Sequence, residues 1–367
     1  MKKYTYSFLL LTLVGLCIVP AINLTNRGVT AIVAGNSPLK IWQNLFNMDF
    51  ALPHIGRIYY QAGVSLDPKS VIIGKSGWFF LGDQYNSTIS VKRRTPTDID
   101  ENLAKNIITN SKEWESWFLS NGVKAYKIVI GPDKDSVYPE YLPYWAKPAN
   151  FTITDLISSM DSGGIILYPK REIISSKPQF AAPLYFKTDT HWNIAGASIA
   201  FEQLMQSLSK SDKSLKWPAP TTMNDIILNE RTGGDLSKFQ RISEFIEDQK
   251  PDLIEPTYSQ ASIRLTEFGS GKLIPAAPNA DVANVKIPTV VTSDKAINKM
   301  RVLWLRDSFG SAMAPFMAET FYETLQVHTT ISTPDLVKKL TKSFKPDFVV
   351  MTTVERMARR DFLLRQP

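Results

Sequence analysis

Two stretches of the chain together contain the residue types of a serine nucleophile site. The first, KTDTHWN at residues 187–193, places Asp189 two residues before His191. The second, RVLWLRDSFG at residues 301–310, carries an apolar run directly into a turn that contains Ser308. A serine hydroxyl is nearly inert at neutral pH, so it needs a base within hydrogen-bond distance and a third group that fixes the tautomer of that base. Ser308, His191 and Asp189 provide one candidate for each role.

A metal site is the alternative chemistry for the first stretch, because Asp189 and His191 could be two ligands of a zinc ion. Zinc needs at least one more strong protein ligand. The other two histidines, His54 and His328, are explained as ordinary polar residues, and the single cysteine, Cys17, lies in an N-terminal apolar run. Carboxylates would have to complete such a site. We therefore expect neither a metal nor a soluble cofactor.

The elements that must position these residues alternate between helix and strand, which is typical of crossover units and a parallel sheet. Ser308 then lies at a strand-to-helix turn, where parallel sheets place their active sites and where the first N–H groups of the helix can stabilise an oxyanion. Amphipathic spacing predicts the helices and apolar runs predict the strands. The expected elements are helix 98–120, strand 123–130, helix 154–162, strand 164–168, helix 193–208 with Asn193 as its N-cap, strand 300–305, helix 309–321, strand 324–329, helix 334–342 and strand 348–353.

Two regions depart from this alternation. Residues 71–83 contain two short β-rich runs around a Gly-containing turn and predict a hairpin. The GKS sequence within them is no phosphate-binding loop, because Lys69 occupies the position of the motif's first glycine and a strand follows where a helix is required. Residues 213–299 carry seven prolines and scattered β-like runs, so we expect an irregular, β-rich insertion there.

The chain begins with an export signal. Positive residues at positions 2 and 3 precede an almost wholly apolar run at residues 8–24, about the minimum length for crossing a bilayer. We favour an uncleaved anchor over a cleavable signal peptide, because the possible cut site at residues 19–21 contains a proline. The preceding charge places the start in the cytoplasm and the remainder outside. We expect an anchor at residues 1–27, a membrane-proximal segment at 28–69 and a catalytic domain at 70–367.

Composition limits the remaining classes of function. The 367 residues, 44% of them hydrophobic, suffice for one large or two ordinary globular domains. Because Cys17 lies in the apolar run, the exported part contains no cysteine and forms no intrachain disulfide. The net charge of +7 suits an anionic polymer or membrane surface. No arginine-rich run or stacking-aromatic motif accompanies that charge, so we expect no nucleic-acid binding.

Four motifs resemble those of the alginate O-acetylation proteins of the AlgJ and AlgX type. They are DTHWN at 189–193, RDSFG at 306–310, GWFFL at 77–81 and YPEYLP at 138–143. The resemblance spans residues 70–360 and implies an SGNH-hydrolase-like, flavodoxin-like α/β fold, with a parallel sheet flanked by helices. It also implies that Ser308 is the nucleophile, His191 its general base and Asp189 the residue that orients the base.

Four neighbours of the triad are candidates for oxyanion or substrate contacts. Arg306 could hold a sugar carboxylate or support the oxyanion, or it could pair locally. Trp192 could stack on a sugar ring or pack over the catalytic loop. We expect Asp307 to hydrogen-bond the turn and Asn193 to cap the following helix.

The resemblance implies acetyl transfer to hydroxyl groups of an exported polysaccharide, alginate or a similar exopolysaccharide, on the periplasmic side of the inner membrane. The implied partners are the polysaccharide acceptor, a membrane-bound acyltransferase that supplies acetyl groups, and other export proteins. An esterase or deacetylase with the same triad and water as acceptor remains open, and so does a non-catalytic polysaccharide-binding subunit. The intact triad favours a catalyst over a binding subunit.

Overall fold

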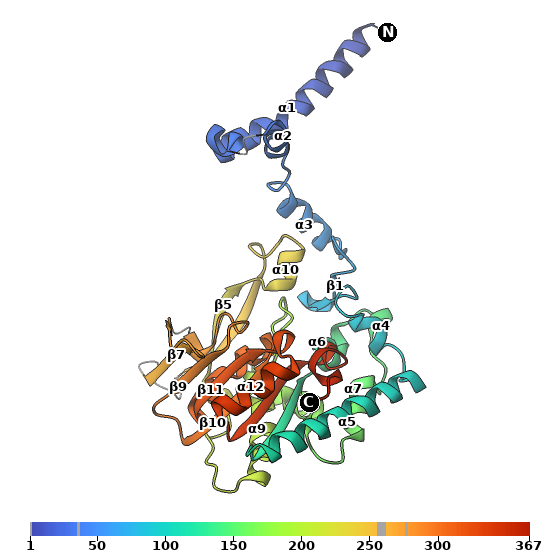
Figure 1. The fold of residues 1–367 in the computed structure, drawn as a ribbon. Helices are drawn as coiled ribbons and strands as arrows, with labels where there is room; N and C mark the ends of the chain where they lie inside the picture. The colour runs from blue at the N-terminus through green and yellow to red at the C-terminus, as the bar shows by residue number, and fades with distance from the viewer. Residues whose placement is uncertain (1, 35–36, 255–261, 276–277) are drawn as a thin grey trace. The chain divides into compact units, whose positions relative to one another are not determined.

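The computed structural model describes residues 2–34, 37–254, 262–275 and 278–367 (Figure 1). The chain has two compact units. The first unit comprises residues 1–66 together with 240–242, and the second comprises residues 67–239 and 243–367.

The N-terminal unit contains one helix that is long and apolar enough to cross a membrane, over residues 4–33. This helix, α1 (Lys2–Val33), is interrupted at Gly28, whose φ of 75° lies in the left-handed region that favours glycine. Two short helices follow, α2 (Pro38–Leu45) and α3 (Leu52–Gln61). The side-chain amide of Asn23 donates hydrogen bonds to the carbonyls of Leu45 and Asn47, which ties α1 to the end of α2.

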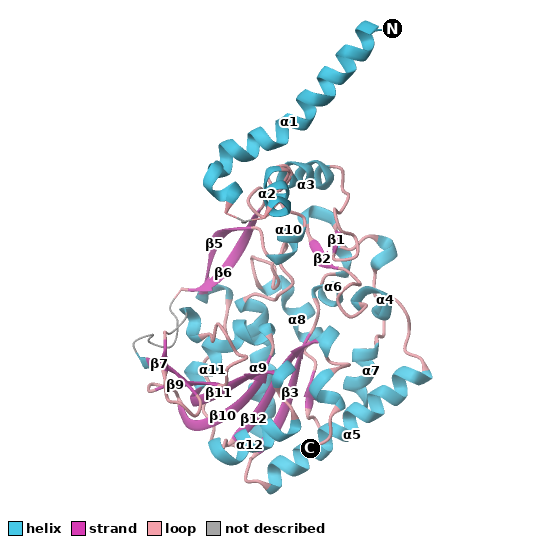
Figure 2. Ribbon diagram, turned by 45° about the horizontal axis from the view of Figure 1, so that its top comes forward, coloured by secondary structure: helices cyan, strands magenta, loops and turns pink. Residues whose placement is uncertain are grey.

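An eight-stranded sheet organises the second unit (Figure 2). Its order is β4 (Ile166–Leu167), β3 (Ala125–Gly131), β12 (Phe348–Val354), β10 (Asn298–Arg306), β11 (Phe321–His328), β9 (Thr289–Ser293), β7 (Ile263–Glu267) and β8 (Leu273–Ile274). The first five strands are parallel to one another, as expected from the helix–strand alternation. The last three pair antiparallel, so the sheet is mixed and not parallel throughout.

Helices cover both faces of this sheet, because successive residues of each buried strand point to opposite faces. On one face, the strand residues pack with α5 (Asp98–Ser120), α7 (Ile153–Met160) and α12 (Pro334–Phe344). On the other, they pack with α8 (Lys170–Ser176), α9 (Ile194–Ser211) and α11 (Ala314–Thr320). The expected strands and, with one exception, the expected helices are present, and the SGNH-hydrolase-like fold class is confirmed.

The helix expected at residues 309–321 is divided in the structure. Residues 308–313 form a 3₁₀ turn, and α11 begins only at Ala314, with Pro315 in its first turn. Proline fits the first turn of a helix because the N–H that it lacks would have no partner there. The nucleophile candidate thus lies on a tight turn rather than on a long helix.

The described residues of both irregular regions form strands. The hairpin expected at residues 71–83 is formed by β1 (Val71–Ile73) and β2 (Phe79–Leu81), which pair antiparallel. Within the expected insertion, β7, β8 and β9 extend the main sheet instead of forming a separate lobe. Its other part is an antiparallel pair, β5 (Ile226–Thr232) and β6 (Glu247–Leu253), with α10 (Asp235–Phe239) between them. Residues 255–261 and 276–277 of the insertion lie outside the described residues.

Candidate active site

The turn after β10 presents Ser308 at the carboxyl end of the parallel strands. Asp307 caps the turn, since its Oδ1 accepts a hydrogen bond from the N–H of Phe309 at 2.9 Å. Its Oδ2 accepts one from the N–H of Val354, at the end of β12, at 2.7 Å. Asp307 therefore joins the ends of two neighbouring strands, in the structural role expected for it. Ser308 itself is exposed.

His191 reaches this turn from the loop that precedes α9. Asn193 caps α9 as expected, because its Oδ1 accepts hydrogen bonds from the N–H groups of Ala195 and Gly196. Trp192 is buried between the two loops, and its Nε1 donates to the carbonyl of Phe309 at 2.8 Å. This bond connects the residue after the histidine directly to the residue after the serine. The two stretches of sequence are thus fixed against each other.

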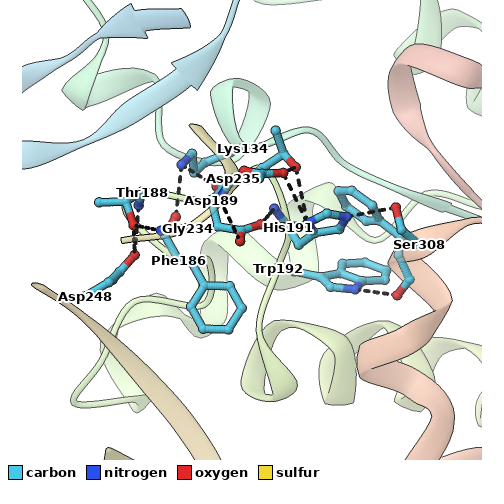
Figure 3. A network of polar contacts seen from close by, with 12 residues as sticks. Lys134, Phe186, Thr188, Asp189, His191, Trp192, Gly234, Asp235, Asp248 and Ser308 are labelled. Atoms are coloured by element: carbon cyan, nitrogen blue, oxygen red, sulfur yellow. Dashed lines mark hydrogen bonds and ion pairs between the residues drawn. The ribbon is translucent and has the colours of Figure 1, made fainter. Parts of the chain in front are cut away.

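The three predicted triad residues form one continuous hydrogen-bonded chain (Figure 3). His191 Nε2 lies 2.8 Å from Ser308 Oγ, and His191 Nδ1 lies 2.6 Å from Asp189 Oδ1. With a proton on Nδ1 bonded to the carboxylate, Nε2 is left to accept the serine proton. The arrangement can therefore activate a hydroxyl as a nucleophile.

The carboxylate of Asp189 is held in its charged form. Burial raises its pKa, but the hydrogen bonds and charge of His191 lower it more, so the pKa of Asp189 lies well below its usual range. A carboxylate that stays ionised can stabilise the imidazolium that forms when His191 takes a proton.

The N–H groups of the turn are less available for an oxyanion than expected from the sequence. The N–H of Phe309 is bonded to the Asp307 side chain, and that of Gly310 donates to the Asp307 carbonyl at 3.2 Å. Among the described residues, the N–H of Ser308 has no hydrogen-bond acceptor. One main-chain donor, at the nucleophile itself, is therefore left for the oxyanion.

The polar atoms of Arg306, Trp192 and Asn193 form hydrogen bonds within the fold, as those of Asp307 do, so the contacts expected of these four residues with substrate or an oxyanion stay predictions. The side chain of Arg306 is only 1% exposed. Its guanidinium donates to Gln326 Oε1 at 2.7 Å and to the Val282 carbonyl at 3.2 Å, and it pairs with Asp281. Trp192 packs over the catalytic loop, and the side-chain amide of Asn193 caps α9 and donates a hydrogen bond to the Pro183 carbonyl at 2.6 Å.

The region 213–299 contributes to the site in a way that the sequence did not indicate. Asp235, at the start of α10, accepts hydrogen bonds from the N–H and the hydroxyl of Thr190 at 2.8 and 2.5 Å. Asp248, on β6, accepts bonds from the N–H and hydroxyl of Thr188 at 2.8 and 2.6 Å. The sequence does not indicate these contacts, because Asp235 and Asp248 are far from residues 188–191 in the chain. Both carboxylates hold the loop that carries Asp189 and His191 (Figure 3).

The metal alternative retains a geometric basis, because Asp189, His191 and Asp235 each offer a ligand atom within 4.8 Å of the others. The nitrogen of His191 on this side is Nδ1, which lies 2.6 Å from Asp189 Oδ1. A proton shared in that bond and a metal cannot occupy the same lone pair. The observed contacts therefore fit an oriented base better than a metal ligand.

Two solved structures with TM-scores above 0.5 share this fold. The structure is similar to Bacillus cereus PatB1, with a TM-score of 0.56 and 13% identity over 81% of this chain and 100% of that one. It is also similar to a DHHW family protein from Eubacterium siraeum DSM 15702, with a TM-score of 0.52 and 13% identity over 82% and 95% of the two chains. The O-acetyltransferase domain of Pseudomonas putida AlgJ gives a TM-score of 0.47 and 18% identity over 81% and 96%.

Among curated proteins, no sequence matches the chain. The family model for the SGNH hydrolase-like domain of the acetyltransferase AlgX matches residues 71–284, which is more than half of the chain. That range includes Asp189 and His191 and ends before Ser308. The chain belongs to the AlgX family of SGNH hydrolase-like acetyltransferases.

Proposed function

We propose that this protein transfers acetyl groups to hydroxyl groups of a polysaccharide through an acetyl-serine intermediate on Ser308. The observation that carries the proposal is the unbroken chain of hydrogen bonds from Asp189 through His191 to Ser308. The family supports polysaccharide O-acetylation in general. The proposed intermediate and the alginate-like acceptor go beyond the family assignment.

The proposed reaction has two steps of the same kind. His191 Nε2 takes the proton of Ser308 as Oγ attacks the acetyl carbonyl, and the imidazolium then returns that proton to the leaving oxygen of the donor. The product is an acetyl ester on Oγ. A sugar hydroxyl next gives its proton to Nε2 and attacks the ester carbonyl. As the ester bond to Oγ breaks, the imidazolium passes that proton to Oγ, which restores the serine hydroxyl and releases the acetylated sugar.

Hydrolysis of the intermediate is the competing outcome. Ser308 is exposed, so water can reach an acetyl group on it, and a bound acceptor has to exclude that water for transfer to dominate. We propose an exported polysaccharide, alginate or a similar polymer, as that acceptor. A membrane-bound acyltransferase would supply the acetyl group, and the apolar helix at residues 4–33 would anchor the chain so that the site faces the periplasm.

The test is incubation of the full chain with a chromogenic acetyl ester and oligosaccharides, followed by mass spectrometry of protein and sugars. Wild type should carry an acetyl group on Ser308 and pass it to the sugar, whereas Ser308→Ala should do neither. Ser311→Ala is the matched control, because that serine lies on the same turn and its hydroxyl accepts from Arg306 rather than donating to His191. Equal transfer by wild type and Ser308→Ala would overturn the proposal, and acetate release without acetylated sugar would favour an esterase.

A further inference from the structure

A buried lysine lies directly behind the triad loop. Lys134 follows β3 at the carboxyl end of the sheet, and the residue is only 3% exposed. Its ammonium group donates hydrogen bonds to three main-chain carbonyls, those of Phe186 at 2.9 Å, Lys187 at 2.8 Å and Asp189 at 2.7 Å (Figure 3). All three acceptors belong to the short segment that leads into His191.

The number of bonds matches the chemistry of an ammonium group. A charged lysine has three N–H donors and no acceptor, so each proton has one carbonyl. A neutral amine has only two N–H bonds, and its lone pair would face the third carbonyl oxygen. The observed contacts therefore use the charged form, and they fix the lysine at one point from three directions.

The hairpin β1–β2 closes the other side of this lysine. Lys134 Nζ lies 5.7 Å from the ring centre of Trp78 and 5.5 Å from that of Phe80, within the range of a cation–π interaction. The N–H of Phe79, between these rings, donates to the carbonyl of Lys187 at 2.9 Å. The aromatic motif at residues 77–81 thus encloses the lysine and shares one of its acceptors.

We propose that Lys134 is a positioning residue for the acetyl transfer, whose ammonium group holds residues 186–189 so that the carboxylate of Asp189 meets the imidazole of His191. This inference rests on the proposed function. The lysine bonds to the main-chain carbonyl of Asp189 and leaves its carboxylate to His191, Arg231 and the N–H of Asp235. Its charge also favours the ionised carboxylate that the imidazolium needs.

The surroundings of Lys134 bring the protonation of its ammonium group into the range of neutral pH. Burial lowers the pKa of Lys134 to about 7, although the charges of Asp189, Asp235, Asp248 and Asp135 act to raise it. The three hydrogen bonds are observed independently of this pKa. The pKa adds that the position of residues 186–189 depends on the protonation of one side chain, Lys134.

The test compares Lys134→Met with Lys127→Met in the full chain. Lys127 is a matched control, because it is also a buried lysine, on β3, and its Nζ donates to the carbonyl of Gly164 at 2.8 Å, away from the triad loop. We expect Lys134→Met to lower kcat for the chromogenic ester about 100-fold, the scale of an ångström-sized misplacement of catalytic groups, with little change in KM. Lys127→Met should keep the wild-type kcat.

Three outcomes separate the inference from the proposed function. If Lys134→Met keeps the wild-type kcat while Ser308→Ala is inactive, the positioning role is wrong and the proposed function stands. If Ser308→Ala is as active as wild type, the proposed function itself fails. Should Lys134→Met not fold, Lys134→Arg replaces it: a planar guanidinium keeps the charge but cannot direct three donors from one nitrogen, so a wild-type kcat in that variant would overturn the inference.

Discussion

Gly234 lies so close to Asp189 that a side chain has no room between them. A β-carbon on Gly234 would lie 2.4 Å from the β-carbon of Asp189 and 2.6 Å from its Oδ2. Both distances are far below van der Waals contact, so this position requires glycine because of close approach. Gly234, which directly precedes α10, thus allows the segment 233–235 to come this near to the triad carboxylate.

Gly234→Ala should therefore displace Asp189 and lower activity. Because a misplacement of about 1 Å costs roughly 100-fold in rate, we expect a loss of this size in kcat. Gly233→Ala is the control, since its β-carbon would meet the side chain of Ser237 instead of the triad. Ester hydrolysis by both variants, measured with their melting temperatures, checks this. Equal kcat losses in the two variants would mean that the activity depends on the turn at residues 233–234 in general and not on the contact between Gly234 and Asp189.

Asp189→Asn should retain the shape of the site and lose most of its rate. An amide can present N–H to His191 Nδ1 and thereby favour the wrong tautomer, and it carries no charge to stabilise the imidazolium. We expect kcat to fall by about 10³–10⁴-fold, as for other Ser-His-Asp sites. Asp235→Asn is the comparison, because its Oδ2 lies 3.8 Å from His191 Nδ1 and bonds to Thr190 instead. A larger effect from Asp235→Asn would reassign the orienting role.

Removal of metal ions should leave the rate unchanged. The bond between Asp189 and His191 occupies the nitrogen that a metal at the Asp189, His191 and Asp235 group would need. The measurement is ester hydrolysis before and after dialysis against a chelator, with elemental analysis of the purified protein. A stoichiometric ion whose removal abolishes activity would contradict the serine mechanism proposed above.

The activity should decline on the alkaline side as Lys134 loses its proton. The pKa of Lys134 is lowered by burial to about 7, so the ammonium with three donors is present below this pH and is lost above it. Lys134→Arg keeps its charge throughout, because arginine remains protonated in proteins. The pH profile of kcat for the variant should lack the decline that wild type shows. The same decline in both proteins would assign it to another group.

The parts of the fold that follow from local patterns could be predicted from the sequence. The helix at 98–120 and the strands that flank Ser308 are encoded by apolar periodicity, which depends on neighbouring residues alone. The triad residues could also be predicted, because each lies in a short motif that contains a nucleophile, a base or a carboxylate. The antiparallel edge could not be predicted in this way, because β9 is only five residues long and its pairing with β11 is a contact between distant segments.

The supports of the site could not be predicted for a related reason. No residue near Lys134 in the sequence indicates that its partners are carbonyls of residues 186–189. Every residue has a main-chain carbonyl, so residue types do not show which carbonyls accept hydrogen bonds. Arg306 shows the converse problem. A polar residue beside a nucleophile suggests a substrate contact, and only its burial and its bonds to Gln326 and Val282 show that it supports the fold.

A buried network of charges lies beside the site, at the ends of β3 and β12. Lys92 Nζ lies 3.1 Å from Asp133 and 2.5 Å from Asp135, and all three side chains are at most 5% exposed. Arg356 also pairs with Asp133, and the carboxylate of Glu355 accepts from the N–H of Asp133 at 2.8 Å. Burial raises the pKa of Asp133, but the charges of Lys92 and Arg356 lower it more, whereas burial raises the pKa of Asp135 to about 7 against the charge of Lys92.

Asp133→Asn should be the most damaging change in this network. It leaves Arg356 without its partner and Lys92 with one carboxylate fewer, and breaking a buried pair in this way costs about 3–5 kcal/mol of unfolding free energy. Denaturant unfolding near neutral pH measures this, with Asp135→Asn as the matched control.

Because the folded pKa of Asp135 lies above its ordinary value of 3.8, wild type loses stability from this group as the pH rises from about 4 to 7. Asp135→Asn should lack that loss, so its deficit relative to wild type should shrink over the same interval. A deficit that grows instead would show that Asp135 is ionised throughout and that Lys92 depends on it as much as on Asp133.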